Sequence, residues 1–333
     1  MPMIRAMRLL NAIEAGTTTG AQLQTLLAAD PGRLAELNAL LGMRGQARRM
    51  AASSTAMNAV AASSTAMNAV AASSTAMNAV AASSTAMAAV AASTTAMAAV
   101  YASPSAVMAI MPSAFMVFGP HTEQITLSGS EVTQWKDSTG NGRHLLGSTA
   151  GARPTFSGTA MNGYITLEFD GTNDKLVGNA NFTIPDACTV FIVSRKDGDG
   201  TYGLVGSDTT DNGGLIESGT ALYVDYSGGA SSYSFALSTV AGVPRLISGW
   251  GTGNTTNLRL NANTPVQRSD CNLLGAGGTM AFSVGFAADP DWAGNVFFDG
   301  KIAEVIVLGA QKAPGDAEYN RIVEMLRTKY ALW

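Results

Sequence analysis

AASSTAMNAV, at residues 51–60, recurs unchanged at residues 61–70 and 71–80. Two close variants follow, AASSTAMAAV at 81–90 and AASTTAMAAV at 91–100, and a more divergent unit, YASPSAVMAI, ends the series at residue 110. No Asp, Glu, Lys or Arg occurs between Ala51 and His121. So regular a period indicates one local structure repeated along the chain, with a different part of the sequence on either side.

The spacing within the repeat predicts a helix. Steps of three residues from Met to Val, four to the next Ser and three to the next Met give three turns per ten residues, about 3.3 residues per turn. Ala and Met favour helix, although Ser and Thr do not. One such helix cannot bury its narrow Met/Val stripe, so we predict a shaft in which three identical chains associate, overwound and left-handed. The predicted trimer seam consists of Met57, Val60, Met67, Val70, Met77, Val80, Met87, Val90, Met97 and Val100.

A continuous helix over these sixty residues would extend roughly 90 Å. Two other structures stay open for the segment: a disordered low-complexity linker, and a stacked β repeat with ten residues per rung. A membrane span is disfavoured, because each identical repeat carries three hydroxyl side chains. The segment is also far longer than the roughly 20 residues of one bilayer crossing.

Residues 1–50 show helical periodicity in three pieces, the first of them marked by Ile4, Met7, Leu10 and Ile13. Thr17–Thr19 and Asp30 before Pro31 supply helix caps, and the third helix is expected to run on to arginines 44, 48 and 49 near its C-terminal end. Six Arg and three acids give this segment a net charge of +3. Helices this short bury little surface alone, so we predict that they attach the chain to a partner.

The sequence changes character after Pro112. Short alternating apolar runs are separated by Gly, Asn, Asp and Ser, which predicts an antiparallel β-sandwich. The clearest predicted strands are Tyr164–Phe169, Thr189–Ser194, Leu222–Tyr226, Arg245–Ser248 and Ile302–Leu308. A final helix is predicted from Asp316 to Tyr330.

Four spaced motifs carry a family resemblance. They are WKDSTGNG at 135–142, RPT at 153–155, FDGTND at 169–174 and GKIAEVI at 300–306 before the terminal helix. Together they resemble laminin-G-like, concanavalin A-like domains over residues 125–333. The resemblance implies a jelly-roll sandwich with a closing strand and helix, but no single function, since such domains include lectins, adhesion modules and glycosidases.

The N-terminal half has a second resemblance. A helical start joined to AASSTAM-type decapeptides is similar to tail-fibre and head-fibre proteins of tailed bacteriophages. That resemblance implies a surface-exposed virion protein that is trimeric and ends in a receptor-binding domain. Residues 1–50 would then attach to another virion protein, residues 51–110 would form the shaft, 111–124 a linker and 125–333 the domain that adheres to the host.

Catalytic patterns are weak in this sequence. A sandwich glycosidase needs two carboxylates that face each other, often alternating on one strand, and no Glu-x-Asp-x-x-Glu or Glu-x-Asp-x-Glu run occurs. Glu168 and Asp170 share a strand face, but Asp170 is interpreted as a structural turn residue. No nucleophile elbow or phosphate-binding loop is present. We therefore predict a protein that is not an enzyme, with polysaccharide degradation as the less favoured alternative.

Metal and cofactor signals are also weak. Cys188 and Cys271 fit neither a ligand spacing nor a disulfide framework and are expected to be buried thiols. His144, one of two histidines, is expected on the surface or in a turn hydrogen bond. Asp197–Gly200 (DGDG) and the Asp289–Asp291 loop offer oxygen atoms to calcium, but solvated turns are commoner, so no metal or other cofactor is predicted.

A sugar-binding surface is predicted from aromatic residues in loops. Their rings can pack on a pyranose while polar neighbours form hydrogen bonds with its hydroxyl groups. Trp292 is the leading candidate, because Asp289, Asp291 and Asn295 surround it in the sequence. Tyr202, Tyr223 and Tyr226 are further candidates, whereas Trp135 is assigned to the core. The predicted ligand is a host-surface glycan or protein. A purely architectural head-fibre or decoration protein is the other reading, and nucleic acid or membrane insertion is not expected.

Overall fold

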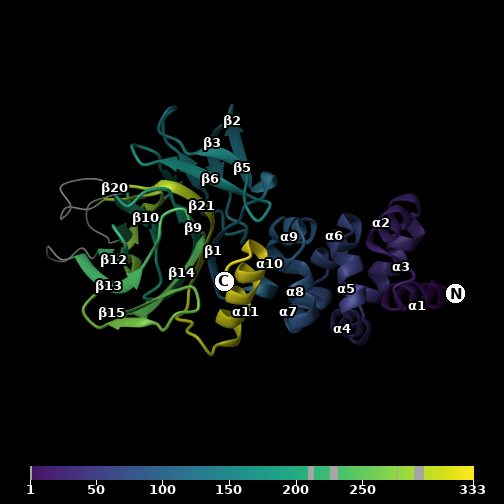
Figure 1. Ribbon diagram of the computed structural model, residues 1–333. Coiled ribbons are helices and arrows are strands. Elements are labelled where there is room, and N and C mark those ends of the chain that lie inside the picture. The colour runs from purple at the N-terminus through teal and green to yellow at the C-terminus, as the bar shows by residue number, and fades with distance from the viewer. Residues whose placement is uncertain (1, 209–213, 226–231, 276, 289–295) are drawn as a thin grey trace. The chain divides into compact units, whose positions relative to one another are not determined.

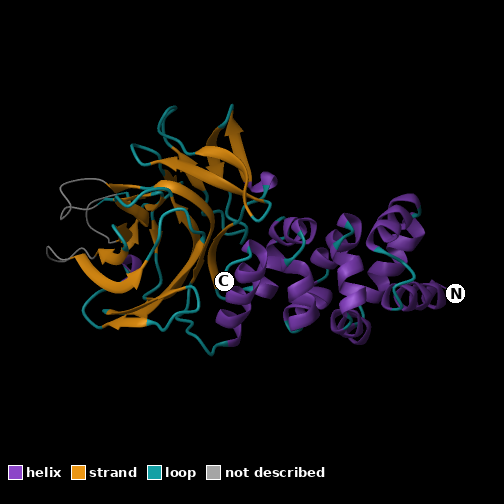
Figure 2. Cartoon of the chain, viewed as in Figure 1, coloured by secondary structure: helices purple, strands orange, loops and turns teal. Residues whose placement is uncertain are grey.

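The computed structural model describes residues 2–208, 214–225, 232–275, 277–288 and 296–333 (Figure 1). The chain divides into two compact units. A helical unit comprises Met1–Pro112 and Gly315–Ala331, and a β unit comprises Ser113–Pro314 and Leu332–Trp333. Figure 2 shows this separation of helix and strand. The coarse prediction, helices followed by an antiparallel β domain, is confirmed.

Short helices make up the helical unit. They are α1 (Pro2–Glu14), α2 (Gly20–Ala29), α3 (Pro31–Leu41), α4 (Arg44–Ala52), α5 (Ser54–Ala61), α6 (Ser64–Ala72), α7 (Ser74–Ala81), α8 (Ser84–Ala91), α9 (Thr94–Tyr101), α10 (Pro104–Ile110) and α11 (Ala317–Tyr330). Each decapeptide therefore forms one helix of about two turns, and the continuous helix predicted for residues 51–110 is wrong.

The first Ser of each repeat explains the break. Ser63 has extended backbone angles (φ −111°, ψ 113°), and its Oγ accepts a hydrogen bond from the N–H of Ala66 at 3.2 Å. Ser73, Ser83, Ser93 and Ser103 cap their helices in the same way. A Ser hydroxyl in this role satisfies a backbone donor that has no partner within the helix, so it ends one helix and starts the next.

The helices stack in layers of three. Helix α4 packs on α7, α5 on α8, α6 on α9 and α7 on α10, so each of the helices α4 to α7 lies against the third helix after it. The chain bends by 101° between α8 and α9. The capping Ser also ties the layers together, because Ser83 Oγ donates to the carbonyl of Ala51 at 2.7 Å and Ser93 Oγ to that of Ala61 at 2.6 Å. The repeat is thus a helical solenoid built within one chain.

This packing corrects the predicted trimer seam. Met57, Val60, Met67 and the other seam residues are between 0% and 6% exposed within one chain. The prediction assumed that the stripe had no partner in its own chain, and the layers above and below it provide that partner. The reason for expecting a homotrimer along this seam is therefore lost.

The N-terminal segment belongs to the same unit as the repeat. The predicted caps are confirmed: Thr19 and Gln22 form a capping box, and Asp30 accepts the N–H of Gly32 at 2.8 Å. There are four helices up to Ala52 rather than three, because α4 is separate from α3 and carries Arg44. Helices α2 and α3 pack on α5 and α6, so the layers continue across the predicted boundary at residue 50.

The terminal helix is where the sequence predicted it, but it belongs to the other unit. Helix α11 packs on α8 and α10, beside the blue repeat helices in Figure 1. Arg321 of α11 donates to the carbonyls of Ile110 at 2.8 Å and Ala81 at 3.3 Å. The predicted assignment of this helix to the sandwich is therefore wrong.

The β unit contains short antiparallel strands: β1 (Ala114–Phe118), β2 (Ile125–Ser128), β3 (Glu131–Trp135), β4 (Leu145–Gly147), β5 (Thr155–Met161), β6 (Tyr164–Asp170), β7 (Leu176–Gly178), β8 (Phe182–Thr183), β9 (Ala187–Lys196), β10 (Thr201–Ser207), β11 (Gly214–Ser218), β12 (Ala221–Asp225), β13 (Ser232–Ser238), β14 (Arg245–Thr252), β15 (Thr255–Leu260), β16 (Val266–Arg268), β17 (Thr279–Met280), β18 (Phe282–Val284), β19 (Phe286–Ala287), β20 (Val296–Phe297) and β21 (Asp299–Leu308). Two 3₁₀ turns, Thr122–Gln124 and Leu273–Gly275, accompany them.

Two runs of strands share one core. The first run is β1-β21-β9-β14-β15-β16, and the second leads from β4 through β7, β18, β10, β11 and β12 to β13. Neighbouring strands in both runs are antiparallel. Val190 and Ile192 of β9 join Leu215 and Phe282 of the second run in the main hydrophobic cluster. The five predicted strands correspond to β6, β9, β12, β14 and β21 as far as the chain is described, and β6 joins the first run by pairing with β21.

The predicted linker at 111–124 is instead part of the sheet. Strand β1 pairs with β21, so Val117 lies opposite Ile306. Trp135 is fully buried, as predicted, and its indole Nε1 donates to the carbonyl of Gly119 at 2.8 Å. The β unit therefore begins directly after Pro112.

Within the described residues, no single helix is long and apolar enough to span a membrane. Helices α8 and α9 are long and apolar enough only when they are taken together, and the chain bends by 101° between them.

Candidate functional site

A pocket of about 410 Å³ opens on the β unit beside the FDGTND turn. The side chains that line it come from β3, β5, β6, β21 and the loops after β4, β6 and β9. They are Glu131, Arg153, Thr155, Glu168, Phe169, Asp170, Asp174, Asp197 and Asp299, together with Gly151. Six carboxylates thus face a single guanidinium, and the pocket is strongly acidic.

Three of the carboxylates are held by cations. Glu131 pairs with Arg153 at 3.5 Å, and Asp197 pairs with Arg195 at 3.0 Å. Glu168 pairs with Lys301 on the adjacent strand β21, and this hydrogen bond holds the pKa of Glu168 below its ordinary value. These pairs neutralise half of the acidic lining without closing the pocket.

The other three carboxylates accept hydrogen bonds from neutral donors. Asp170 Oδ1 accepts the N–H groups of Thr172 at 2.8 Å and Asn173 at 3.2 Å, which confirms its predicted structural role in the turn. Asp299 Oδ2 accepts the Tyr202 hydroxyl at 3.3 Å. Asp174, only 5% exposed, accepts the N–H of Asp170 at 3.0 Å. No cation in the described part of the chain pairs with these three side chains.

Asp174 is the most perturbed of these acids. Burial raises the pKa of Asp174 from 3.8 to about 6, the charges of Asp170 and Glu131 raise it as well, and the hydrogen bond from the Asp170 N–H opposes them. The pocket therefore gains negative charge as the pH rises through about 6.

This shift predicts a pH-dependent stability. Because folding raises the pKa of Asp174, ionisation of its carboxyl penalises the folded state, so stability present below pH 3.8 is lost as the pH rises through about 6. Over this pH range the free energy of unfolding of the parent chain should fall by at most about 3 kcal/mol, and Asp174→Asn should abolish this fall. The check is urea unfolding of both proteins from about pH 4 to about pH 8. Parallel pH profiles of the two proteins would contradict the assignment.

Most of the predicted sugar-binding residues are not among those that the structure describes. Trp292, Asp289, Asp291, Asn295 and Tyr226 lie outside the described residues. Tyr223 is half-buried on β12 and packs against the small cluster of Ile216, Ala287 and Val296.

Tyr202, one of the two predicted residues that the structure describes, contacts the pocket through its hydrogen bond to Asp299. Its ring packs edge-on against Phe298, with centroids 6.1 Å apart. Gly198 and Gly200 of the DGDG turn lie so close to Tyr202 that a Cβ on either would be under 3 Å from its side chain. The glycines of this turn thus make room for the tyrosine.

The remaining side chains singled out by the sequence have structural roles. His144 Nδ1 accepts the N–H of Asp137 at 3.1 Å, which confirms the predicted turn bond. Cys188 and Cys271 are buried free thiols, and burial raises the pKa of Cys188 to about 12. Asp199 pairs with Lys196 at 3.0 Å. No group of three His, Cys, Asp or Glu side chains among the described residues is arranged to hold a metal.

Comparisons with known proteins assign no family. No family model matches the chain, and no curated protein matches it. Among solved structures, Trypanosoma rangeli sialidase aligns with 65% of this chain at 11% identity and a TM-score of 0.41. A structure of botulinum neurotoxin type C, whose cell entry depends on two ganglioside molecules, aligns with 67% of this chain at 8% identity and a TM-score of 0.46. The receptor-binding domain of botulinum neurotoxin type G aligns with 63% of this chain at 9% identity and a TM-score of 0.43.

These similarities are partial on both sides. The chain spans 33% of the sialidase and about half of each toxin structure (53% and 51%). All three TM-scores are below 0.5, so they transfer no function to this chain.

Proposed function

We propose that this chain is a virion fibre protein whose β unit binds a carbohydrate-containing surface ligand in the acidic pocket, without cleaving it. The observation that carries the binding proposal is the set of carboxylates at Asp170, Asp174 and Asp299, which pair with no cation among the residues that the structure describes. Carboxylate oxygens accept hydrogen bonds from vicinal hydroxyl groups, and these bonds are stronger than those between neutral groups. The virion role is supported by the resemblance of the helical start and its decapeptides to phage fibres.

The negative charge of the pocket limits the class of sugar that it can bind. An anionic sugar would bring a further negative charge next to six carboxylates, of which only three are paired with cations. A neutral sugar, or an amino sugar that carries an ammonium group, avoids this repulsion. The proposed ligand class is therefore a neutral or amino-sugar polysaccharide.

Binding should be tested with the full chain on an array of neutral, amino and sialylated glycans, followed by affinity measurements on the best neutral or amino sugar. Asp299→Asn keeps an oxygen for the Tyr202 hydroxyl but loses the charge, so we expect affinity to fall about tenfold or more. Asp270→Asn is the matched control, because Asp270 is an acid of the same unit that pairs with Arg268 outside the pocket. Preference for sialylated glycans, or equal affinity of the two variants, would rule out the proposed site.

Polysaccharide hydrolysis is the second candidate, favoured by one observation. The pocket contains a carboxyl whose pKa is raised, Asp174, and another whose pKa is lowered, Glu168. Enzymes that cleave glycosidic bonds use as general acid the carboxyl group with the raised pKa and as base or nucleophile the one with the lowered pKa. Release of reducing sugar from a bound polysaccharide, lost in Asp174→Asn, would establish hydrolysis in place of simple binding.

A further inference from the structure

Helix α11 takes the place of a further repeat helix in the stack. It packs on α8 as α7 packs on α4, although the whole β unit separates α10 from α11 in the sequence. Its apolar face is covered: Tyr319, Ile322 and Leu326, at spacings of three and four residues, are 0% exposed. A helix from a distant part of the sequence thus continues the layers that the decapeptides build.

A hydrogen bond that recurs along the solenoid also continues into α11. The capping Ser of α8, α9 and α10 donates to a carbonyl near the end of the helix four positions before it. The series is Ser83 to Ala51, Ser93 to Ala61 and Ser103 to Ala71, at 2.7, 2.6 and 3.0 Å. The next carbonyl in this series belongs to Ala81, and Arg321 of α11 donates to it at 3.3 Å. Arg321 therefore satisfies a carbonyl at a helix end that the Ser of another decapeptide would otherwise bind.

The last decapeptide is modified where α11 meets it. Its first residue is Tyr101, whereas the five units before it all begin with Ala. The Tyr101 side chain is buried, and the Nζ atom of Lys329 on α11 lies 4.6 Å from the centroid of its ring. The negative face of an aromatic ring attracts a cation at this distance. Because the decapeptides contain no cation, the last unit is fitted to α11 rather than to another decapeptide.

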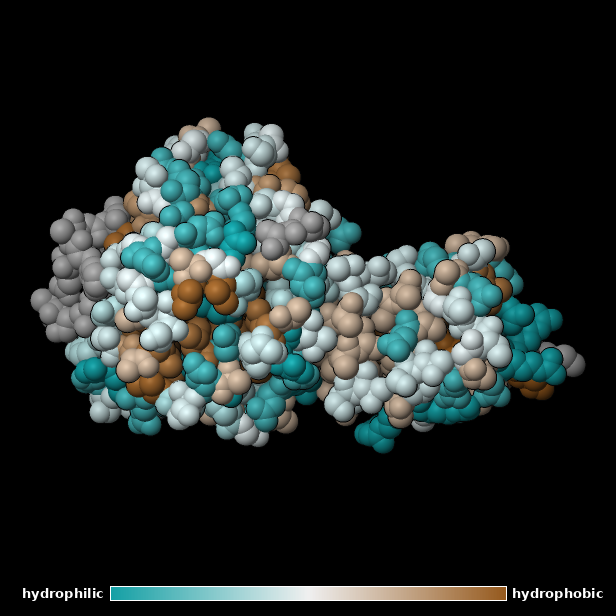
Figure 3. All heavy atoms as spheres, viewed as in Figure 1, coloured by the Kyte–Doolittle hydropathy of each residue, from teal (hydrophilic) through white to brown (hydrophobic). Residues whose placement is uncertain are grey.

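The outer face of α11 differs from the repeat helices in charge. Asn320 and Glu324 are exposed, and Glu324 pairs with Arg327 at 2.6 Å. Residues 51–110 carry no charged side chain, and tan and white surface covers much of the repeat helices in the space-filling view (Figure 3). The terminal repeats of solenoids need a polar outer face of this kind, because an uncovered layer associates with other apolar surfaces.

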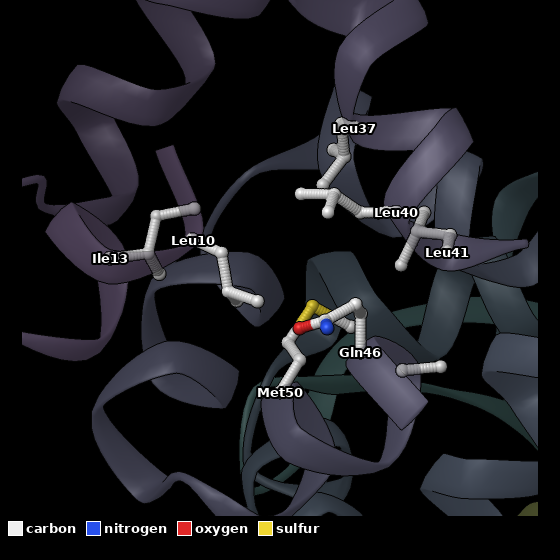
Figure 4. A pocket seen from close by; sticks show the side chains of 8 residues that line it. Leu10, Ile13, Leu37, Leu40, Leu41, Gln46 and Met50 are labelled. Carbon is white, nitrogen blue, oxygen red and sulfur yellow. The ribbon is translucent and has the colours of Figure 1, made fainter. Parts of the chain in front are cut away.

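The layers of this unit are closely packed where they are covered. Leu10, Leu37 and Met50 point toward one another between α1, α3 and α4, and the space left there is about 10 Å³, no more than a single water molecule needs (Figure 4). Buried Ala, Met and Val side chains fill the layers between repeat helices, so one decapeptide layer is complementary to another. A second copy of the chain carries the same decapeptides, and no charge on either copy opposes their contact.

We propose that α11 is the cap of the solenoid, which keeps the chain monomeric by covering an end of the decapeptide stack that otherwise binds the same end of a second copy. Contact between two such ends uses the same surface on both copies and gives a dimer. The cap lies within the helical unit, so its role goes beyond ligand binding by the β unit and does not depend on it.

The first test makes the outer face of α11 apolar in the full chain. Asn320→Leu with Glu324→Leu leaves the buried face of α11 intact, so this outer-face variant should fold and then dimerise in sedimentation velocity at micromolar concentrations. Ser54→Leu with Asn58→Leu is the matched control, because these exposed side chains are also one turn apart but belong to α5, inside the stack. The control and the parent chain should remain monomers. Equal association of the outer-face variant and its control would overturn the proposal.

The second test detaches α11 from the stack. Ile322→Asp with Leu326→Asp places two charges on the buried face of the helix and should release it. Trypsin reports the release, because it should cut after Arg321 and Arg327 faster than in the parent chain. The released variant should dimerise, and a synthetic peptide of residues 316–331 with the natural sequence should return it to a monomer.

Two results of the second test count against a cap. One is a released variant that trypsin cuts within α11 but that stays monomeric. The other is association that the natural peptide does not reverse, because the surface that associates is then not the site of α11. If the released variant loses the helical circular dichroism of the repeats, the outer-face variant and its control decide the outcome.

Discussion

Replacing Met67 with Ala is expected to lower the free energy of unfolding of the helical unit by about 2–5 kcal/mol. Met67 is fully buried on α6, which packs on α3 below it and α9 above it. Removing most of its side chain leaves a cavity between layers that short, capped helices close only in part. Chemical unfolding followed by circular dichroism at 222 nm measures the loss, and the chain offers its own control.

Asn68 is the neighbouring position, exposed in α6 and replaced by Ala in the fourth and fifth repeats at Ala88 and Ala98. Asn68→Ala should therefore leave stability unchanged or raise it slightly, because Ala has the higher helix propensity. Unfolding of the parent chain should not depend on protein concentration, because Met67 is buried within one chain. An unfolding midpoint that rises with protein concentration would instead show that association between chains contributes to stability.

Removing the carboxyl of Glu217 should destabilise the β unit by about 3–5 kcal/mol. Glu217 on β11 is fully buried and accepts a hydrogen bond from Arg245 on β14, which is 2% exposed. Arg245 also donates to the carbonyls of Val240 and Val243, both at 3.3 Å. Glu217→Ala would leave a buried guanidinium charge without its counter-charge, the most costly way to break such a pair.

Two further proteins test the cause of that loss by urea unfolding. The double variant Glu217→Leu with Arg245→Met removes both charges and should recover most of the stability. Asp270→Ala breaks the exposed pair with Arg268 and should cost much less than Glu217→Ala, because water screens an exposed pair. If Glu217→Ala costs no more than Asp270→Ala, the burial of this pair contributes little to the β unit.

Local features of the fold were predictable from the sequence. The alternation in Tyr164–Phe169 and the apolar runs around Val190 and Ile306 correspond to β6, β9 and β21. Asp30 before Pro31 and the threonines before Gly20 marked helix starts correctly. These signals succeed because caps and strand alternation depend on neighbours in the sequence.

The arrangement of the repeat was not predictable in the same way. The sequence around Ser63 is compatible with two structures. Ser63 could be an exposed residue within one long helix, or it could cap a short helix, and the three-residue spacing of Met and Val fits both. The choice depends on whether Met67 finds its partner in another chain or three helices away in its own. Counting the first Ser of each unit as a possible N-cap would have revealed the alternative, since its hydroxyl favours that position.

The acidic pocket was missed for a related reason. Glu131, Asp174 and Asp299 come from segments far apart in the sequence, whereas the pattern expected of a sandwich glycosidase places its carboxylates on one strand. Only the pairing of β21 with β6 places Asp299 opposite Asp170. The two acids of FDGTND were visible, but nothing local to them indicates which distant acids share their pocket.

Three helices per layer also set a rule for how the length of this protein can change. Asn58, Asn68 and Asn78 lie on three successive sides of the solenoid, and the helix of Ala88 stacks on the helix of Asn58. Loss or gain of one decapeptide would move every later helix to the next side, so each column of stacked side chains would be shuffled. Loss or gain of three would shorten or lengthen the columns and leave their composition in register. Length variants that preserve the surface pattern are therefore expected in steps of a full layer, even though the sequence repeats every ten residues.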